Sequence, residues 1–100
     1  MTIREFQAAI HAQYFKKDSA RGLGGTFLWF AEEVGELAEA LRHGTQAEKE
    51  AEFADVLAWL STMASMAGVD LESAAAGKYG KGCPRCGGTP CRCAEPAPAP

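Results

Sequence analysis

The sequence has no hydrophobic run near the roughly 20 residues needed to cross a bilayer, and its first residues do not form a signal peptide. We therefore expect a cytoplasmic protein. No cysteine occurs before Cys83. No glycine is followed by Lys-Ser or Lys-Thr, so the glycines at residues 22–25 are not a phosphate-binding loop of the Walker type. These absences argue against a membrane span and against a P-loop nucleotidase.

The chain of 100 residues is long enough for one domain but short for an adequate hydrophobic core. Association between copies would bury more apolar surface. We therefore expect a homodimer or a homotetramer.

Charge is divided unevenly along the chain. Residues 32–55 hold eight acids and two bases, a balance of −6, whereas residues 76–93 hold four bases and no acid, a balance of +4. An acidic centre does not suit direct nucleic-acid binding. An acidic metal site beside a basic segment suits a small polyphosphate that arrives with its cation.

Two acid pairs, Glu33 with Glu36 and Glu52 with Asp55, are each spaced i,i+3 on a predicted helix. Residues three apart on a helix lie about 60° from each other, so both carboxylates of a pair can reach one point. If the helices pack together, the four carboxylates converge, and their repulsion favours a bound cation. With no His or Cys nearby, oxygen ligands indicate Mg²⁺ or Mn²⁺. The alternative is a solvated acidic face.

The predicted packing faces of these two helices are apolar stripes at helical spacing, and the acid pairs lie along their borders. The stripes comprise Phe27, Phe30, Val34, Leu37 and Leu41 in the first helix, and Phe53, Val56, Leu57, Leu60, Met63 and Ala64 in the second.

The motif Glu32-Glu33-x-x-Glu36, followed by Glu52-x-x-Asp55, resembles the signature of the MazG-type all-α nucleoside triphosphate pyrophosphohydrolases. The match includes Glu-Glu-Val-Gly-Glu-Leu-Ala-Glu-Ala and Phe-Ala-Asp-Val-Leu, and extends more weakly over residues 3–80. The resemblance implies hydrolysis of nucleoside triphosphates to a monophosphate and pyrophosphate. It also implies an active site that a neighbouring chain can complete.

The expected fold is all-α, with four helices in residues 1–80 that assemble as an oligomer. The first helix starts at a capping box, Thr2 with Glu5, and runs to about Lys17. Residues 18–25 break it, because three glycines in four residues disfavour a helix. The acid-bearing helices, residues 26–43 and about 45–67, are separated by Gly44 and a second capping box, so they form an antiparallel hairpin. A short fourth helix runs from Asp70 to about Lys78.

Several other residues are candidates for catalysis or substrate binding. Glu32 lies about 100° round the helix from Glu33 and can accept a proton from the attacking water or hold a second ion; we place it with Glu36 as catalytic. Trp29, one turn before Glu33, either packs in the core or stacks on a nucleobase. The resemblance implies basic residues after the fourth helix that hold phosphates, and Lys78 and Lys81 are the candidates.

The C-terminal segment contains every cysteine, at Cys83, Cys86, Cys91 and Cys93. Four thiols in eleven residues are typical of a compact zinc knuckle spanning residues 81–93. Disulfides, redox-active thiols or an unfilled cluster are the alternatives. Residues 94–100, rich in proline and alanine, are expected to be disordered.

The sequence therefore predicts a Mg²⁺-dependent pyrophosphohydrolase that removes unwanted nucleoside triphosphates, either non-standard or deoxy, and so cleans the nucleotide pool. The alternative is a non-catalytic, zinc-containing helical interaction module.

Overall fold

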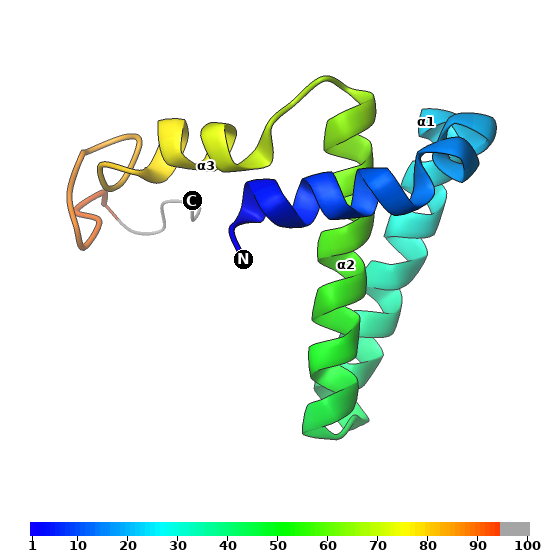
Figure 1. The fold of residues 1–100 in the computed structure, drawn as a ribbon. Helices are drawn as coiled ribbons and strands as arrows, with labels where there is room; N and C mark the ends of the chain where they lie inside the picture. The colour runs from blue at the N-terminus through cyan, green and yellow to red at the C-terminus, as the bar shows by residue number, and fades with distance from the viewer. Residues whose placement is uncertain (95–100) are drawn as a thin grey trace.

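The computed structural model describes residues 1–94 and contains three helices, α1 (Ile3–His43), α2 (Gln46–Met66) and α3 (Leu71–Tyr79) (Figure 1). Within the described residues there is no strand, so the predicted all-α fold is confirmed. None of these helices is long and apolar enough to cross a membrane. Apart from Ala94, the tail that the sequence predicts to be disordered lies outside the described residues.

Helix α1 bends once, at Gly22, where φ is 81° and ψ is 168°. Glycine adopts a positive φ without the clash that a Cβ would cause, and the helix resumes directly after it. The predicted break in residues 18–25 is present as a kink, and it is confined to Gly22, the one residue there that leaves the helical conformation. Helix α1 continues across this kink, so the described residues hold three helical elements where the sequence predicted four. Arg21 spans the kink and donates hydrogen bonds to Asp18 (2.9 Å) and to the Thr26 hydroxyl (3.2 Å).

Residues 23–43 of α1 pack against α2 as an antiparallel hairpin (Figure 1), as predicted. The connection is only Gly44 and Thr45. The Thr45 hydroxyl accepts from the Glu48 amide (3.2 Å), while the Glu48 carboxylate accepts from the Thr45 amide (3.0 Å). This capping box starts α2 immediately after the turn and keeps the two helices side by side.

The seam between the two helices contains only part of the apolar stripe that the sequence predicted, since Phe27, Val34, Leu41, Phe53 and Leu60 are exposed. In residues 26–43 five side chains are buried or half-buried, and they follow one another at intervals of four and three residues. Helix α2 has half-buried side chains at the same intervals. Residues that alternate four and three apart face a partner helix, as along a coiled-coil seam. The centre of this seam lies about 60° around the first helix from the centre of the predicted stripe. The seam contains Thr26, Phe30, Glu33, Leu37 and Ala40 of α1, and Lys49, Glu52, Val56, Trp59 and Met63 of α2.

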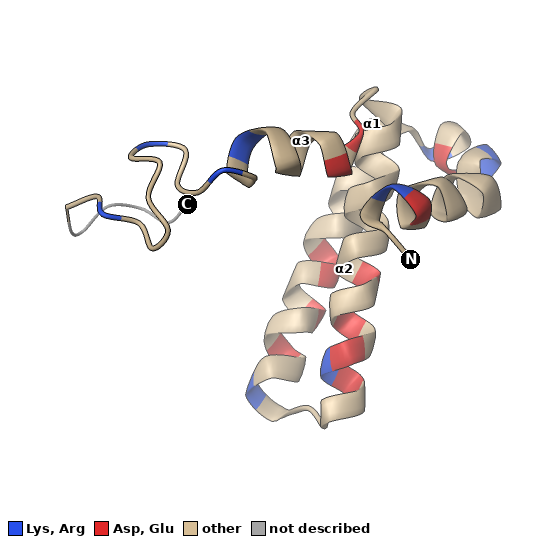
Figure 2. Ribbon diagram, turned by 60° about the vertical axis from the view of Figure 1, so that its left-hand side comes forward, with Lys and Arg blue, Asp and Glu red and all other residues tan. Residues whose placement is uncertain are grey.

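This rotation gives the hairpin one apolar face and one acidic face. In an antiparallel pair, residues one position after a seam residue lie on the same face for both helices, and residues one position before lie on the opposite face. The apolar face carries Phe27, Val34, Leu41, Phe53 and Leu60, each 38–55% exposed. The acidic face carries Trp29, Glu32, Glu36, Glu39, Glu48 and Asp55, and Figure 2 shows acids gathered along this part of the hairpin.

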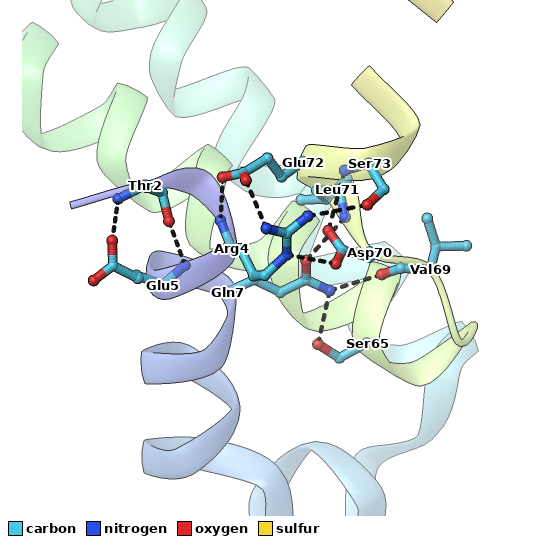
Figure 3. Close-up of polar contacts among 10 residues, drawn as sticks. All are labelled: Thr2, Arg4, Glu5, Gln7, Ser65, Val69, Asp70, Leu71, Glu72 and Ser73. Atoms are coloured by element: carbon cyan, nitrogen blue, oxygen red, sulfur yellow. Dashed lines mark hydrogen bonds and ion pairs between the residues drawn. The ribbon is translucent and has the colours of Figure 1, made fainter. Parts of the chain in front are cut away.

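Helix α3 is held against the start of α1 by the side chains of Arg4 and Gln7 (Figure 3). The Arg4 guanidinium forms ion pairs of 2.8 Å with both Asp70 and Glu72. Gln7 is buried and uses both ends of its amide, so each of its polar groups is satisfied. It accepts from the Leu71 amide (3.0 Å) and donates to the Val69 carbonyl (2.8 Å) and the Ser65 hydroxyl (3.1 Å).

Candidate metal and nucleotide site

Three carboxylates from the two hairpin helices meet at one point. Glu33, Glu36 and Glu52 each place an oxygen within 4.8 Å of the others. Glu33 and Glu52 start from seam positions, where packing keeps them partly buried, and Glu36 reaches in from the acidic face. The predicted convergence of the two acid pairs is therefore present for these three residues. Their role as ligands remains a prediction.

Two of these carboxylates each have one buried oxygen without a hydrogen-bond partner. Glu33 Oε2 and Glu52 Oε2 are buried, and neither has a hydrogen-bond partner. A buried, unpaired carboxylate oxygen is costly unless a proton or a cation compensates its charge. The pKa of Glu33 is raised from 4.5 to about 7, mainly because burial disfavours the charged form, and further because Glu36, Asp55 and Glu52 repel its negative charge.

The donor set suits a hard divalent cation. All three converging groups are carboxylates, which are the ligands that Mg²⁺ and Mn²⁺ prefer, and no thiol or imidazole belongs to this cluster. A cation here would compensate the two unpartnered oxygens and remove the repulsion that raises the Glu33 pKa. The residues therefore fit a magnesium or manganese ion.

The remaining predicted acids lie around this cluster. Asp55 is exposed on the acidic face and its charge acts on Glu33, but it does not belong to the cluster of three converging carboxylates. Glu32 and Glu39 are also exposed on the acidic face. Glu39 lies 4.0 Å from the His43 imidazole. Nothing in the geometry tests whether Glu32 acts as the base.

A cleft of about 320 Å³ opens beside Asp55, between the first part of α1 and α2. Two cationic side chains, Lys17 and Arg21, and two aromatic ones, Tyr14 and Trp59, line it together with Asp18, Thr62, Ile10 and Ala58. The acid cluster and a cationic, aromatic cleft thus share one side of the hairpin.

A polar network fixes the wall of this cleft. Buried Asp18 accepts from Arg21 (2.9 Å) and from the Thr62 hydroxyl (3.2 Å), which ties the kink of α1 to α2. The Arg21 guanidinium lies over the Trp59 ring, 4.8 Å from its centroid. Trp59 stacks on Trp29, with centroids 6.1 Å apart and planes 10° apart. Both readings of Trp29 stay open, since it packs on Trp59 yet is 48% exposed.

The sequence profile of the MazG nucleotide pyrophosphohydrolase domain matches residues 23–87. The chain belongs to the MazG family. This match covers both halves of the acidic motif and confirms the resemblance found in the sequence. A search of curated proteins finds no match. Membership of the MazG family implies nucleotide pyrophosphohydrolase activity in general, without naming the substrate.

Sequence reasoning missed three charged residues of the cleft that precede the matched domain. Lys17, Asp18 and Arg21 fall in or beside the segment that the sequence assigned to a loop, and their spacing acquires meaning only once that segment is helical. The i,i+3 spacing of Asp18 and Arg21 was the available signal.

The two lysines predicted to bind phosphate lie elsewhere. Lys78 lies in the last turn of α3 and Lys81 follows the helix. Figures 1 and 2 show α3 extending away from the acidic part of the hairpin. Within one chain the structure does not bring them to the carboxylates. Their role in substrate binding remains a prediction that requires a second chain.

The four cysteines of the MazG chain come together in the segment after α3, and none forms a disulfide. Their sulfur atoms all lie within 4.8 Å of one another. The pKa of the Cys86 thiol is lowered, chiefly because the amides of Arg92 and Gly88 donate hydrogen bonds to its sulfur.

We expect Glu33→Gln to stabilise the metal-free protein near pH 8. Because the folded-state pKa is about 7, above the ordinary 4.5, the folded state holds a proton that the unfolded state loses between these values. The contribution of this proton to folding stability is fully present below about pH 4.5 and is lost as pH rises through 7. Removing the charge should raise the free energy of unfolding at pH 8 by about 1–2 kcal/mol. This magnitude is reduced to take account of the partial exposure of Glu33.

Thermal unfolding in EDTA at pH 4.5 and pH 8 measures this effect, with Glu50→Gln, an exposed acid of the same hairpin, as the matched control. A Glu33→Gln protein no more stable than the parent at pH 8 would contradict a buried, uncompensated charge.

Proposed function

We propose that this MazG protein hydrolyses nucleoside triphosphates, non-standard or deoxy, to nucleoside monophosphate and pyrophosphate with Mg²⁺ or Mn²⁺. The observation that carries this proposal is the pair of buried, unpartnered carboxylate oxygens on Glu33 and Glu52, held in the seam beside a cationic cleft. A fold that only needed an acidic surface would keep both groups in water. Removal of unwanted nucleotides is the corresponding cellular role.

Each acid has a proposed part. Glu33, Glu36, Glu52 and Asp55 would hold the metal, which would neutralise phosphate oxygens and lower the pKa of a nearby water molecule. A water oxygen attacks the α-phosphorus, the bond between the α-phosphorus and the α–β bridging oxygen breaks, and pyrophosphate leaves. Glu32, exposed one position before Glu33, accepts the proton of the attacking water.

The substrate would lie in the cleft beside the acids. Lys17 and Arg21 line it next to Asp55, so they can contact the phosphates that extend beyond the metal. Arg21 is oriented by Asp18 and by the Trp59 ring, so it is held in place before substrate binds. Trp29, which is 48% exposed, offers an indole face to the base.

A second copy of the chain is proposed to cover the apolar face. Phe27, Val34 and Leu41 recur every seven residues along α1, and Phe53 and Leu60 repeat that spacing along α2. Exposed fractions of 38–55% at all five leave these apolar side chains accessible on the face opposite Glu36 and Asp55. Pairing two hairpins through this face would bury it in a homodimer or homotetramer. A neighbouring chain could then bring Lys78 and Lys81 to the substrate.

We expect Val34→Lys, which places a charge in the middle of the apolar face, to convert the oligomer to monomers. Light scattering coupled to size-exclusion chromatography measures the mass. Ala12→Lys, an exposed position on the first part of α1, is the matched control and should keep the parent mass. A parent protein that is monomeric at micromolar concentration would refute the pairing.

For catalysis, Glu36→Gln is the decisive change. It removes one converging carboxylate that is exposed enough for the fold to tolerate the amide, so we expect turnover to fall about 100-fold or more with helicity retained. Pyrophosphate release is measured across standard and damaged nucleoside triphosphates, with Mg²⁺ and with EDTA. Glu50→Gln should keep the parent rate.

Release that needs Mg²⁺ and vanishes in Glu36→Gln supports the hydrolase and shows its base preference. If the folded parent releases no pyrophosphate from any substrate, the chain is a non-catalytic interaction module and the proposal fails.

Two adjacent lysines test the cleft. Both side chains are exposed, but Lys17 lines the cleft and its neighbour Lys16 does not. Because a charged contact to phosphate contributes roughly 1.5 kcal/mol, Lys17→Ala should raise KM for the triphosphate about tenfold, while Lys16→Ala should leave it unchanged. Equal effects of the two substitutions in steady-state kinetics would mean that the substrate lies outside this cleft.

A further inference from the structure

The segment after α3 has a defined fold without a hydrophobic core. Between Gly80 and Ala94 there is no helix or strand, and only Gly88 is buried. The backbone nevertheless closes a tight loop, in which the Cys83 amide donates to the Gly88 carbonyl (3.0 Å) and the Gly87 amide donates to the Cys83 carbonyl (2.7 Å). Two hydrogen bonds do not offset the conformational entropy of ordering some fourteen residues, so another interaction must stabilise this loop.

The sulfur atoms have the spacing of a metal tetrahedron. Cys83 Sγ and Cys93 Sγ are 3.8 Å apart, and all four sulfurs lie within 4.8 Å of one another. A tetrahedral zinc ion with Zn–S bonds of about 2.3 Å separates its sulfurs by about 3.8 Å. A disulfide would require about 2.05 Å, and no pair is bonded.

Backbone amides point at these sulfurs, as they do around metal-bound thiolates. The Gly88 and Arg92 amides donate to Cys86 Sγ (3.4 and 3.2 Å), and the Cys93 amide donates to Cys91 Sγ (3.3 Å). Such donors stabilise the thiolate form and orient it, which is the role that outer hydrogen bonds have around a metal.

The loop has no room for a side chain at Gly82, where its two halves meet. At Gly82 φ is 104°, and a Cβ would lie 2.8 Å from the Gly87 carbonyl oxygen and 2.9 Å from Thr89 Oγ1. Only glycine fits this position without moving the backbone that carries Cys83. The requirement for glycine shows that the chain path around the thiols is fixed.

We propose that Cys83, Cys86, Cys91 and Cys93 bind one Zn²⁺ as a closed tetrathiolate site, and that this ion folds residues 80–93 independently of the hairpin. Four thiolates leave no open position for substrate, so the site is structural. It stabilises the loop by linking its two halves, Cys83–Cys86 and Cys91–Cys93. The site shares no ligand with the carboxylate cluster, so it does not depend on the proposed hydrolase.

The test uses the full chain expressed with zinc and purified without chelator. Elemental analysis should find one equivalent of zinc per chain, and replacement by Co²⁺ should give the intense visible bands of a tetrahedral thiolate complex. Cys86→Ser should lose both signals, with the helical content of α1 and α2 retained by circular dichroism. Glu36→Gln should keep both, which separates this site from the carboxylates.

Gly82→Ala provides a variant that keeps all four ligands. Competition with a chromogenic chelator should show zinc affinity lowered about tenfold or more, because the loop must distort, while the exposed Arg85→Ala matches the parent. A parent without zinc, a Co²⁺ spectrum typical of oxygen ligands, or a mass two hydrogens lower for each disulfide formed would overturn the proposal.

Discussion

The structure depends on two carboxylates that occupy the seam of a helical hairpin. A seam position normally holds an apolar side chain, yet Glu33 and Glu52 are there, each with a buried oxygen that has no hydrogen-bond partner. Burial and the neighbouring carboxylates raise the pKa of Glu33 to about 7, which favours its protonated form when no cation is bound. Features that destabilise the protein without a cation should therefore increase its affinity for one. The same burial that disfavours the free carboxylates favours the metal complex.

Placing acids in the seam also decides which way the remaining side chains face. Turning the helices so that Glu33 and Glu52 meet moves Phe27, Val34 and Leu41 outward, together with Phe53 and Leu60 of the other helix. One copy of the hairpin then lacks a core of ordinary size, and its buried apolar residues are few: Ile10, Ala40 and Ala64 among the described residues. The buried carboxylates and the exposed apolar face have one common cause. A chain that buries its charges within one hairpin must bury its hydrophobic residues elsewhere.

Sequence reasoning predicted the all-α class, the hairpin and the convergence of Glu33, Glu36 and Glu52, because capping boxes and i,i+3 spacing are local signals. It placed the acids at the border of the interface because it assumed that the most apolar stripe faces the partner helix. That assumption fails where a ligand compensates buried charge. It also missed the cleft of Lys17, Asp18 and Arg21, since the single kink at Gly22 depends on tertiary contacts that three nearby glycines do not reveal.

The two clusters of ligands in this chain follow opposite physical designs. Helix packing places the carboxylates of the proposed magnesium site, so binding energy there would be available to hold a substrate phosphate. The cysteines of the proposed zinc site belong to a segment without a core, so metal binding there would be inseparable from folding. A hard, exchangeable ion would suit the first donor set and a closed thiolate complex the second, and the separation of oxygen from sulfur donors would keep each ion from the other site. The division of the chain at Gly80 is therefore a chemical boundary as well as a structural one.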